Sequence, residues 1–548
     1  MSRWSARIVR LFSAALLLCC GTLSDGRAAP AERLNVLFVA VDDLRPELGC
    51  YGKSLVNSPN IDRLAAEGLR FHRAYCQQAI CGPSRASLMT GLRPDSAGVI
   101  HNEAHFRDKN PEVVTLPQHF RAQGYQTVHV GKIFHPNMVD LEKSWSMTAS
   151  ANWARGSAPY QLAENKQWIA QQRKELEDKW GKPVRGFIAG PVTETADVAD
   201  DAYLDGRVAA EAVELLRKLK ADAGRPFFLG VGFHKPHLPF IAPKRYWDLY
   251  DPAQVQLAAN PLVPRDMPAM ALHDSFELRT YGGSPKSGPI DEQHARHFIH
   301  GYLACASYVD AQIGKVLAEL GALGLRDRTI VILWGDHGWH LGDHGVWGKA
   351  TNFEIATRVP LVIRAPGMKA KGQASDALVE LVDMYPTLCA LAGLPLPPHL
   401  EGHSFAPLLD NPSQPWKKAA FSQFPCPALR EWAALPLSPK MRQGEFRTLI
   451  EEKERQIAAQ LPDKWSRERF EQHVMGYAMR TDRYRLVQWV DQREPQQSLA
   501  LELYDYQDDP LESVNLAVQP KQRPLVQSLL GELRSGWRAA LPAAQVRH

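Results

Sequence analysis

Four short apolar runs, each followed at once by a group of polar side chains, constrain the fold more than any other feature of this sequence. They span residues 34–41, 127–130, 226–232 and 328–333. Apolar runs of this length are typical of strands buried on both faces of a parallel sheet. Segments with helical spacing separate or follow them, at residues 60–68, 116–124, 296–320 and 383–392. Strands that alternate with helices predict an α/β fold, in which helices cover both faces of a large, mostly parallel sheet.

The C-terminal part of the chain has a different pattern. Residues 477–481, 484–490 and 500–506 alternate apolar and polar positions between short turns, and an amphipathic helix follows at 523–541. This alternation predicts a small antiparallel sheet. We therefore expect one large N-terminal domain over residues 30–410 and a smaller α+β subdomain, built on the antiparallel sheet, over residues 411–548.

Three segments carry little of this pattern. Residues 141–200 and 250–295 show no sustained periodicity, so we expect them to be surface excursions over the sheet edge. Residues 442–472 are strongly charged and predict a solvated helix. The overall composition, 45% hydrophobic and 23% charged, excludes a disordered or fibrous chain.

The N-terminus has the layout of a secretory signal peptide over residues 1–29. Three arginines precede the apolar run 11–18, and Ala28-Ala29 ends the segment. The run is too short to span a membrane, so no transmembrane segment is expected. The large or cysteine residue before each of Cys19 and Cys20 disfavours a lipid anchor. We expect a secreted or periplasmic protein.

Charge and cysteine content exclude some classes of function. Residues 1–29 hold four arginines and one aspartate, so their removal lowers the formal charge from +4 to +1. A nearly neutral protein gives no reason to expect nucleic-acid binding. Six scattered cysteines remain and form no C-x-x-C pair, which excludes the common zinc and redox motifs, although one or two disulfides could form in an oxidising compartment.

Two acidic groups follow the apolar runs. Asp42-Asp43 comes directly after run 34–41, and Asp336-His337 comes after run 328–333. Adjacent carboxylates at the end of a buried strand repel each other unless a cation lies between them. The alternative is an exposed acidic loop. We favour a divalent metal, and a mostly oxygen ligand set favours Ca²⁺ over Mg²⁺ and both over zinc.

Residues 81–91 close a polar loop and open an apolar helix. Cys81 is followed by Gly82-Pro83, the capping residue Ser84 and Arg85. A thiol at a helix N-terminus, where unpaired amides favour negative charge, is an anion site that contains a nucleophile. The alternative is that Cys81 is a small buried residue and Arg85 a surface cation.

Cations and imidazoles follow the other runs. Lys132 and His135 come after run 127–130, His237 lies between Pro236 and Pro239 after run 226–232, and Lys349 lies in a glycine-rich loop after run 328–333. Ligands of open α/β sheets collect at the carboxyl ends of the strands. The three loops therefore predict a binding site for an anion.

The motif C-x-P-S-R at residues 81–85, followed by Thr90-Gly91, resembles the signature of type I sulfatases of the alkaline-phosphatase superfamily. The resemblance covers nearly all of the mature chain and is weakest at 141–200 and 410–470. Within that family the sequence is most similar to the iduronate-2-sulfatase branch, including its histidine at position 337 where many sulfatases have asparagine. The motifs that carry this similarity are at 42–46, 131–136, 234–237, 339–349 and 475–477.

The resemblance implies roles for the candidate residues. Cys81 would be converted to formylglycine (3-oxoalanine) by a formylglycine-generating enzyme, and its hydrate would attack sulfur. Arg85 would stabilise the hydrate, and His135 would take the proton whose removal releases sulfate. His237 or Lys349 would protonate the leaving oxygen. The metal would be held by Asp42, Asp43, Asp336, His337 and the modified Cys81, and the sulfate by Lys132, His237 and Lys349.

The expected substrate is a sulfated oligosaccharide or polysaccharide. Arg45 and Trp339 are placed to line the pocket mouth, where a cation can meet a uronate carboxylate and an indole can stack on a sugar ring. Iduronate 2-O-sulfate is one option, and algal polysaccharides and host glycosaminoglycans fit equally well. The competing hypotheses are a phosphonate or phosphodiester hydrolase of the same superfamily, and a non-catalytic protein that binds sulfated glycans with an unmodified Cys81.

Overall fold

The computed structural model describes residues 33–53, 55–148, 160–181, 183, 188–222, 224–431, 435–444 and 446–542. Residues from Leu34 onward form one compact unit. The predicted signal peptide, residues 1–29, lies outside the described residues. The predicted domain boundary at residue 410 stays a prediction.

The large sheet is mixed and mostly parallel, as predicted. Its order is β14-β2-β13-β9-β1-β7-β4-β5, and every strand except β13 (Leu361–Arg364) runs in the same direction. The four predicted runs form its centre: β1 (Asn35–Val41), β4 (Gln126–Gly131), β7 (Phe227–Phe233) and β9 (Thr329–Gly335). The outer strands are β2 (Leu69–Phe71), β5 (Met147–Thr148) and β14 (Ala374–Ser375).

The register of the central strands brings their carboxyl ends together. Val41 lies opposite both Phe233 and Gly335, and Gly131 lies opposite Gly232. The polar residues that follow each strand therefore start from one edge of the sheet. This register gathers the candidate site residues from four distant parts of the sequence.

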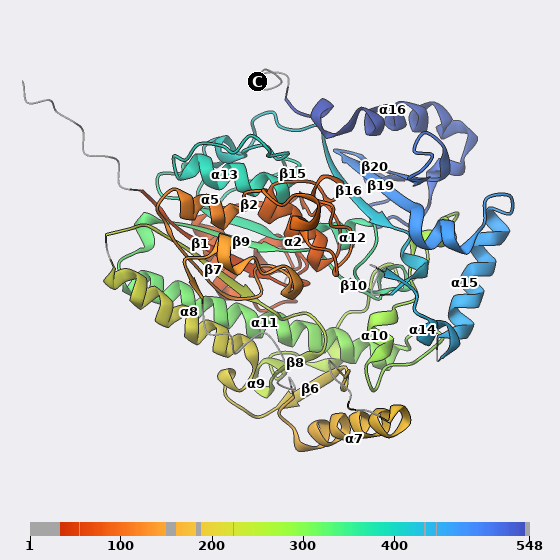
Figure 1. Cartoon of the computed structure of the whole chain (residues 1–548), viewed down its shortest axis with the longest axis horizontal. Coiled ribbons are helices and arrows are strands. Elements are labelled where there is room, and N and C mark those ends of the chain that lie inside the picture. Colours follow the sequence, from red (N-terminus) through yellow and green to blue (C-terminus); the bar gives the residue numbers. More distant parts are fainter. Residues whose placement is uncertain are drawn as a thin grey trace, which may run out of the picture. The chain divides into compact units, whose positions relative to one another are not determined.

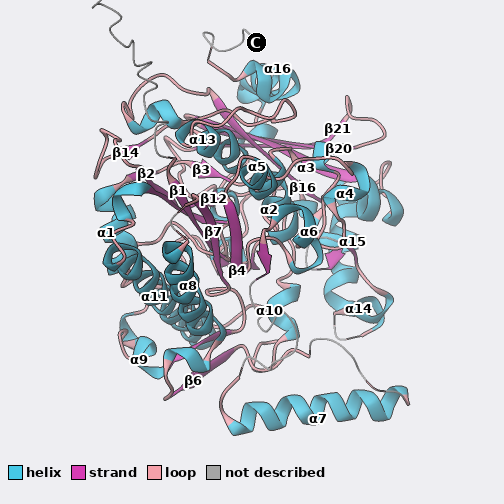
Figure 2. Ribbon diagram, turned by 60° about the vertical axis from the view of Figure 1, so that its left-hand side comes forward, coloured by secondary structure: helices cyan, strands magenta, loops and turns pink. Residues whose placement is uncertain are grey.

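Helices cover both faces of the sheet, also as predicted (Figure 1, Figure 2). On one face Leu37, Val39 and Val41 share a core with α1 (Pro59–Glu67), α8 (Leu204–Ala221) and α11 (Glu292–Ala322). On the other face Val36, Phe38 and Ala40 share a core with α2 (Cys81–Thr90), α5 (Leu116–Ala122) and α13 (Met384–Leu391). Alternate residues of β1 thus point into two different cores.

The smaller sheet is antiparallel, with the order β16-β19-β20-β21. Its strands are β16 (Ala419–Pro425), β19 (Val474–Thr481), β20 (Tyr484–Asp491) and β21 (Ser498–Asp505), and α16 (Arg523–Ala539) packs on one face. β16 is a strand that the sequence pattern did not predict. The Arg485 guanidinium donates to the Asn352 carbonyl at 2.7 Å, and the Asn352 amide donates to the Gly476 carbonyl at 3.2 Å. The small sheet is thereby tied to the loop that follows Lys349.

Within the predicted surface excursion 141–200, residues 163–180 form a helix that the sequence pattern did not predict, α7 (Ala163–Trp180). Within this helix Trp168 and Ile169 pack against the core of the large unit, while charged and amide side chains dominate the rest. An apolar stripe this narrow gives no periodic signal. The predicted charged helix over 442–472 is present in part, as α15 (Arg447–Gln460).

Shorter elements complete the described chain. The helices are α3 (Pro94–Ala97), α4 (Phe106–Lys109), α6 (Leu141–Ser144), α9 (Lys244–Trp247), α10 (Phe276–Thr280), α12 (Glu354–Thr357) and α14 (Pro439–Gln443). The strands are β3 (Ala74–Tyr75), β6 (Thr193–Ala196), β8 (Phe240–Pro243), β10 (His340–Leu341), β11 (Trp347–Gly348), β12 (Arg358–Val359), β15 (Val379–Glu380), β17 (Arg430–Glu431) and β18 (Leu435–Pro436). Across the described ranges, no helix is long and apolar enough to cross a membrane. All six cysteines in these ranges are free thiols.

Candidate active site

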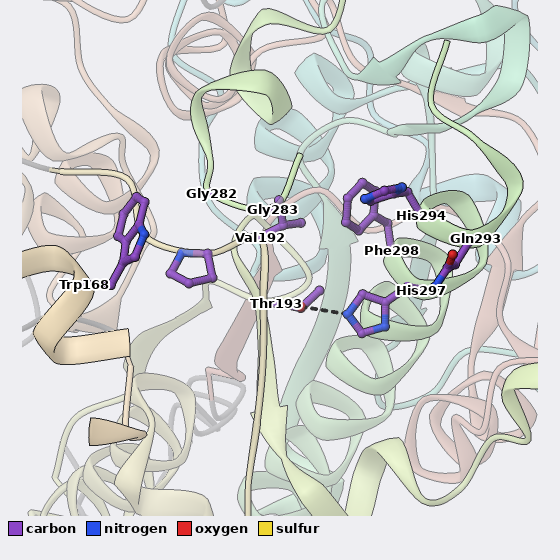
Figure 3. A pocket seen from close by; sticks show the side chains of 10 residues that line it. Trp168, Val192, Thr193, Gly282, Gly283, Gln293, His294, His297 and Phe298 are labelled. Carbon is purple, nitrogen blue, oxygen red and sulfur yellow. Dashed lines mark hydrogen bonds between the residues drawn. The ribbon is translucent and has the colours of Figure 1, made fainter. Parts of the chain in front are cut away.

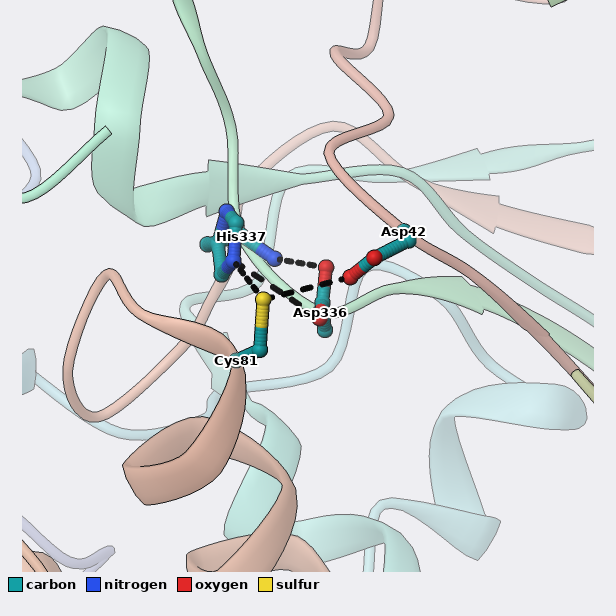
Figure 4. Close-up of side chains that lie close together, drawn as sticks. All are labelled: Asp42, Cys81, Asp336 and His337. Atoms are coloured by element: carbon teal, nitrogen blue, oxygen red, sulfur yellow. Dashed lines mark hydrogen bonds and ion pairs between the residues drawn. The ribbon is translucent and has the colours of Figure 1, made fainter. Parts of the chain in front are cut away.

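Cys81 is the first residue of α2, a helix buried along its whole length. Its Sγ lies 3.3 Å from Asp42 Oδ1 and 3.3 Å from His337 Nε2 (Figure 4). Burial, with the negative charge of Asp42, raises the pKa of the Cys81 thiol well above its usual value. A thiol in this environment stays protonated and is a poor nucleophile. Position 81 thus places its side chain against a carboxylate and an imidazole at the buried start of α2.

The acidic residues form a compact cluster around Cys81. Ligand atoms of Asp42, Cys81, Asp336 and His337 all lie within 4.8 Å of one another, and a second such group joins Asp42 and Cys81 to Asp43 and His237. Asp42, Asp43, Asp336 and His337 are fully buried. His337 Nδ1 donates to the Gly338 carbonyl at 3.0 Å, which leaves Nε2 facing the cluster as a ligand atom.

The charges of the cluster fit a divalent cation. Burial, reinforced by Asp42 and Asp336, raises the pKa of Asp43 well above its usual value despite Lys349. Burial also raises the pKa of Asp336 to about 6 despite Arg85. Three carboxylates this close resist being ionised together unless positive charge is added between them. Oxygen donors with one imidazole are a ligand set suited to a hard cation.

Three cations lie against these carboxylates. Arg85 is fully buried; its Nε donates to Asp336 Oδ2 at 2.8 Å, and its terminal nitrogen lies 3.3 Å from Asp42 Oδ1. Lys132 forms an ion pair with Asp42. Lys349 Nζ lies 2.9 Å from Asp43 Oδ1 and 3.6 Å from Cys81 Sγ. The predicted nucleophile position thus lies among side chains that can neutralise an oxyanion.

The two predicted imidazoles differ in their contacts. His237 Nδ1 donates to the Leu238 carbonyl at 2.7 Å, and its Nε2 lies 4.0 Å from Asp43 Oδ2. The structure therefore brings His237 into the cluster. His135 is half-buried among cations, and burial together with Lys132 lowers its pKa to about 3. Its Nδ1 has no hydrogen-bond partner among the described residues. His135 is thus a neutral base with a free ring nitrogen.

Arg45 and Trp339 are more buried than a pocket mouth requires. Arg45 is 5% exposed and forms ion pairs with Asp343 at 2.9 Å and Glu47 at 2.7 Å. The Trp339 ring lies 5.0 Å from Lys349 Nζ and 6.4 Å from the His237 ring. In this structure Arg45 is neutralised by two carboxylates, and Trp339 packs behind Lys349 and His237.

Glu277 belongs to the site although no sequence pattern predicted it. This residue of α10 places Oε1 3.5 Å from His237 Nε2 and Oε2 3.9 Å from Lys349 Nζ. It comes from the segment 250–295, which carries no periodic pattern. A lone glutamate in such a segment is indistinguishable from a solvated residue.

A family model described as "Sulfatase" matches residues 34–394, which span every candidate residue of this cluster. The chain belongs to the sulfatase family. It is therefore a sulfate-ester hydrolase, as the resemblance implied.

Known relatives agree with this family. Mouse (Mus musculus) iduronate 2-sulfatase is 35% identical over 589 aligned residues, which cover 96% of this chain and 98% of that protein. The structure of BT4656, solved with its substrate D-glucosamine-2-N,6-O-disulfate, matches with a TM-score of 0.67 at 22% identity, covering 92% of this chain and 98% of that one. The phosphonate monoester hydrolase of Agrobacterium radiobacter matches with a TM-score of 0.67 at 25% identity, covering 92% of this chain and 95% of that one. These neighbours share the alkaline-phosphatase-like fold predicted from the sequence.

Proposed function

We propose that this sulfatase removes a sulfate group from a sulfated carbohydrate. The observation that carries the proposal is the similarity to an iduronate 2-sulfatase over nearly the full length of both chains, which extends through the C-terminal sheet. An iduronate 2-O-sulfate unit is the first substrate to test. Glycosaminoglycans and other sulfated polysaccharides belong to the same class.

We propose further that residue 81 acts as formylglycine, made from Cys81 by a formylglycine-generating enzyme. The modified residue would supply a hydrate hydroxyl as nucleophile for the sulfur atom. The geometry supports this proposal, because Cys81 Sγ lies 3.3 Å from Asp42 Oδ1 and 3.6 Å from Lys349 Nζ, at the centre of the proposed sulfate and metal site. Arg85 orients this position through Asp336 and Asp42. His135, neutral and with a free ring nitrogen, is suited to take up a proton there.

The metal that fits the cluster best is Ca²⁺. Asp42, Asp43, Asp336, His337 and the modified residue 81 would hold it, and the ion would polarise a sulfate oxygen. Asp42 and Asp43 are adjacent in sequence and both face the cluster, an arrangement that the larger and more flexible shell of Ca²⁺ tolerates better than that of Mg²⁺. Lys132, Lys349 and His237 would hold the remaining sulfate oxygens.

The leaving alcohol would depart on the side of His237 and Lys349. These two side chains lie next to each other, share Glu277 and pack against Trp339. Lys349 carries a proton that the leaving oxygen can take, and His237 would donate one from Nε2 once that nitrogen is protonated. The sugar ring would therefore extend from the cluster in their direction, and Arg45 and Trp339 would contribute to its pocket through the side chains they hold in place.

We also propose that residues 1–29 direct export to a secreted or periplasmic location. The proposal stands on the charged, apolar and small-residue sections of that segment. It places the enzyme where sulfated polysaccharides are found.

A second candidate is hydrolysis of phosphonate or phosphate esters, favoured by the likeness to the Agrobacterium radiobacter phosphonate monoester hydrolase. The test is to compare turnover of an aryl sulfate, an aryl phosphodiester and a sulfated disaccharide by purified protein from the native host. We expect a higher kcat/KM for the two sulfate esters. A higher kcat/KM for the phosphodiester would reverse the assignment, and turnover of the aryl sulfate without any sulfated sugar would reject the carbohydrate substrate.

A further inference from the structure

A pocket of about 430 Å³ lies between α7, β6, the segment after α10 and the start of α11. Trp168 forms one wall, and His294, His297 and Phe298 form the opposite wall (Figure 3). Val192, Thr193, Gly282 and Gly283 lie between them. None of these residues belongs to the cluster around Cys81.

Three parts of the pocket are connected to segments that carry His237, Glu277 or Lys349, the residues on the side where the leaving alcohol would depart. The Phe240 amide donates to the Val192 carbonyl at 2.7 Å, and Phe240 follows His237 by three residues. Gly282 follows Glu277 by five residues, so their Cα atoms lie within about 19 Å of each other. The Phe298 ring packs edge-on against Trp347 at 5.7 Å, two residues before Lys349. The pocket lining is therefore connected to the segments of His237 and Glu277 along the chain or by a backbone hydrogen bond, and to that of Lys349 through the contact between Phe298 and Trp347.

The chemistry of the lining fits an uncharged ring. Trp168 is half-buried, and its ring packs on the Gly282 backbone, where an added Cβ would lie 3.0 Å from the indole. His297 Nε2 lies 2.9 Å from Thr193 Oγ1, and burial with its histidine neighbours lowers the pKa of His297, so this imidazole is neutral at pH 7. The ten described residues that line the pocket include no lysine, arginine, aspartate or glutamate. Aromatic faces beside neutral hydrogen-bonding groups are the surfaces that pyranose rings use.

We propose that this pocket is a subsite for an unsulfated pyranose ring of the glycan, beyond the ring that carries the sulfate, with Trp168 as its stacking surface. The inference rests on the proposed carbohydrate substrate. It assigns a role to α7, which the catalytic cluster does not use. Sulfated substrates with more than one sugar would gain affinity here, and a single sulfated sugar would not.

The test compares a 2-O-sulfated disaccharide with a tetrasaccharide that carries the same sulfated unit, and uses 4-nitrophenyl sulfate as a reference. Replacement Trp168→Ala is expected to lower kcat/KM for the tetrasaccharide by roughly 2- to 12-fold, the effect of losing one aromatic contact. Turnover of 4-nitrophenyl sulfate is expected to stay unchanged. Trp168→Phe, which keeps an aromatic ring in the wall and guards against misfolding, is expected to fall between wild type and Trp168→Ala.

Trp537→Ala is the matched control. Trp537 is also a half-buried tryptophan in a helix, α16, but it lies far from the pocket lining in sequence and stacks on Arg93 and Arg538. Trp537→Ala should leave unchanged the ratio of kcat/KM for the tetrasaccharide to kcat/KM for 4-nitrophenyl sulfate. Equal losses on all substrates for Trp168→Ala, or no loss on the tetrasaccharide, would overturn the subsite. If wild-type protein cleaves 4-nitrophenyl sulfate but neither sugar, the proposed substrate class itself fails and the subsite falls with it.

Discussion

The carboxyl edge of the large sheet and the Glu502 position of the small sheet bury carboxylates in opposite ways. At the carboxyl edge of the large sheet, Asp42, Asp43 and Asp336 lie against Lys132, Lys349 and Arg85, so buried negative charge is met by buried positive charge. In the small sheet Glu502 is 2% exposed, and its hydrogen-bond donors are the neutral Trp489 at 2.6 Å and Tyr504 at 2.7 Å. The first arrangement is built to carry charge and the second to avoid it.

This difference indicates which buried polar groups serve catalysis. Burial of an ion pair contributes little net stability, so a cluster of cations and carboxylates is retained for another reason. At the strand ends the proposed metal and an anionic substrate would supply that reason. In the small sheet Glu502 has only neutral donors, whereas the buried Arg485 of the same sheet is paired with Glu354 and Glu512.

The largest expected effect comes from replacing Cys81, the proposed source of the nucleophile. Cys81→Ala should lower kcat for any sulfate ester by about 10⁴-fold or more, because no other described residue is placed to replace the attacking hydroxyl. The matched control is Cys76→Ala, which changes a fully buried thiol outside the metal cluster and should keep kcat within a few fold. Steady-state kinetics measures both. Activity retained in Cys81→Ala would contradict the assignment of residue 81.

Removal of the divalent metal is expected to have the next largest effect. Dialysis against a chelator should lower kcat/KM by about 100-fold or more, because the sulfate would lose its strongest source of positive charge. Added Ca²⁺ should restore activity more fully than equal Mg²⁺. Full activity in chelated protein that metal analysis finds empty would exclude a metal-dependent reaction.

Arg85 tests whether the strand-end cluster depends on paired charge for stability as well. Arg85→Ala leaves Asp336 without its buried cation, takes one of two cations from Asp42, and should lower the free energy of unfolding by about 3–5 kcal/mol. Arg467→Ala removes a 56% exposed arginine from Glu454 and should cost no more than about 1 kcal/mol. Urea denaturation in excess calcium compares the two. Equal losses would mean that burial does not distinguish these pairs.

Much of the catalytic cluster could be predicted from sequence, because its residues follow buried strands directly. Asp42-Asp43 and Asp336-His337 needed only the strand runs before them and the rule that parallel strands end at one edge. Glu277 could not be predicted, since its helix lies in an aperiodic segment and its partners His237 and Lys349 are distant in sequence. The ion pairs that bury Arg45 depend on Asp343, 298 residues away, and no local pattern reports such a contact.

The same limit applies to the fold. The four central strands and most of the helices that cover them were predicted because their apolar patterns are long and unambiguous, whereas α8 (Leu204–Ala221) was not predicted. Strand β16 was missed because its residues 419–425 alternate weakly, and α7 because its apolar stripe consists mainly of Trp168 and Ile169. Both become ordered through contacts made elsewhere in the chain, which override weak local preference.

The smallest expected effect on stability concerns Glu502, the buried carboxyl group whose hydrogen-bond donors are neutral. Burial, with the charge of Glu512, raises the pKa of Glu502 from 4.5 to about 7. The hydrogen bonds from Trp489 and Tyr504 lower this pKa but do not outweigh burial. The folded protein therefore holds this proton more tightly than the unfolded chain, so stability is full below pH 4.5 and falls as the pH rises through 7. Glu502→Gln should remove this fall, which amounts to about 3 kcal/mol.

Urea denaturation at pH 5 and pH 8 checks this prediction. The difference in unfolding free energy between the two pH values should be smaller in Glu502→Gln than in wild type by that amount. An unchanged pH dependence would mean that Glu502 is ionised in the folded protein and that the contrast between the two sheets is wrong.

The most direct test of the central claim is peptide mass spectrometry on the tryptic fragment that contains residue 81, from protein made in the native host. If residue 81 is formylglycine, the fragment shows the mass loss that accompanies conversion of the Cys81 CH₂–SH group to an aldehyde. A fragment that carries the unmodified thiol, isolated from protein that is folded and hydrolyses sulfate esters, would show that the active residue is not formylglycine.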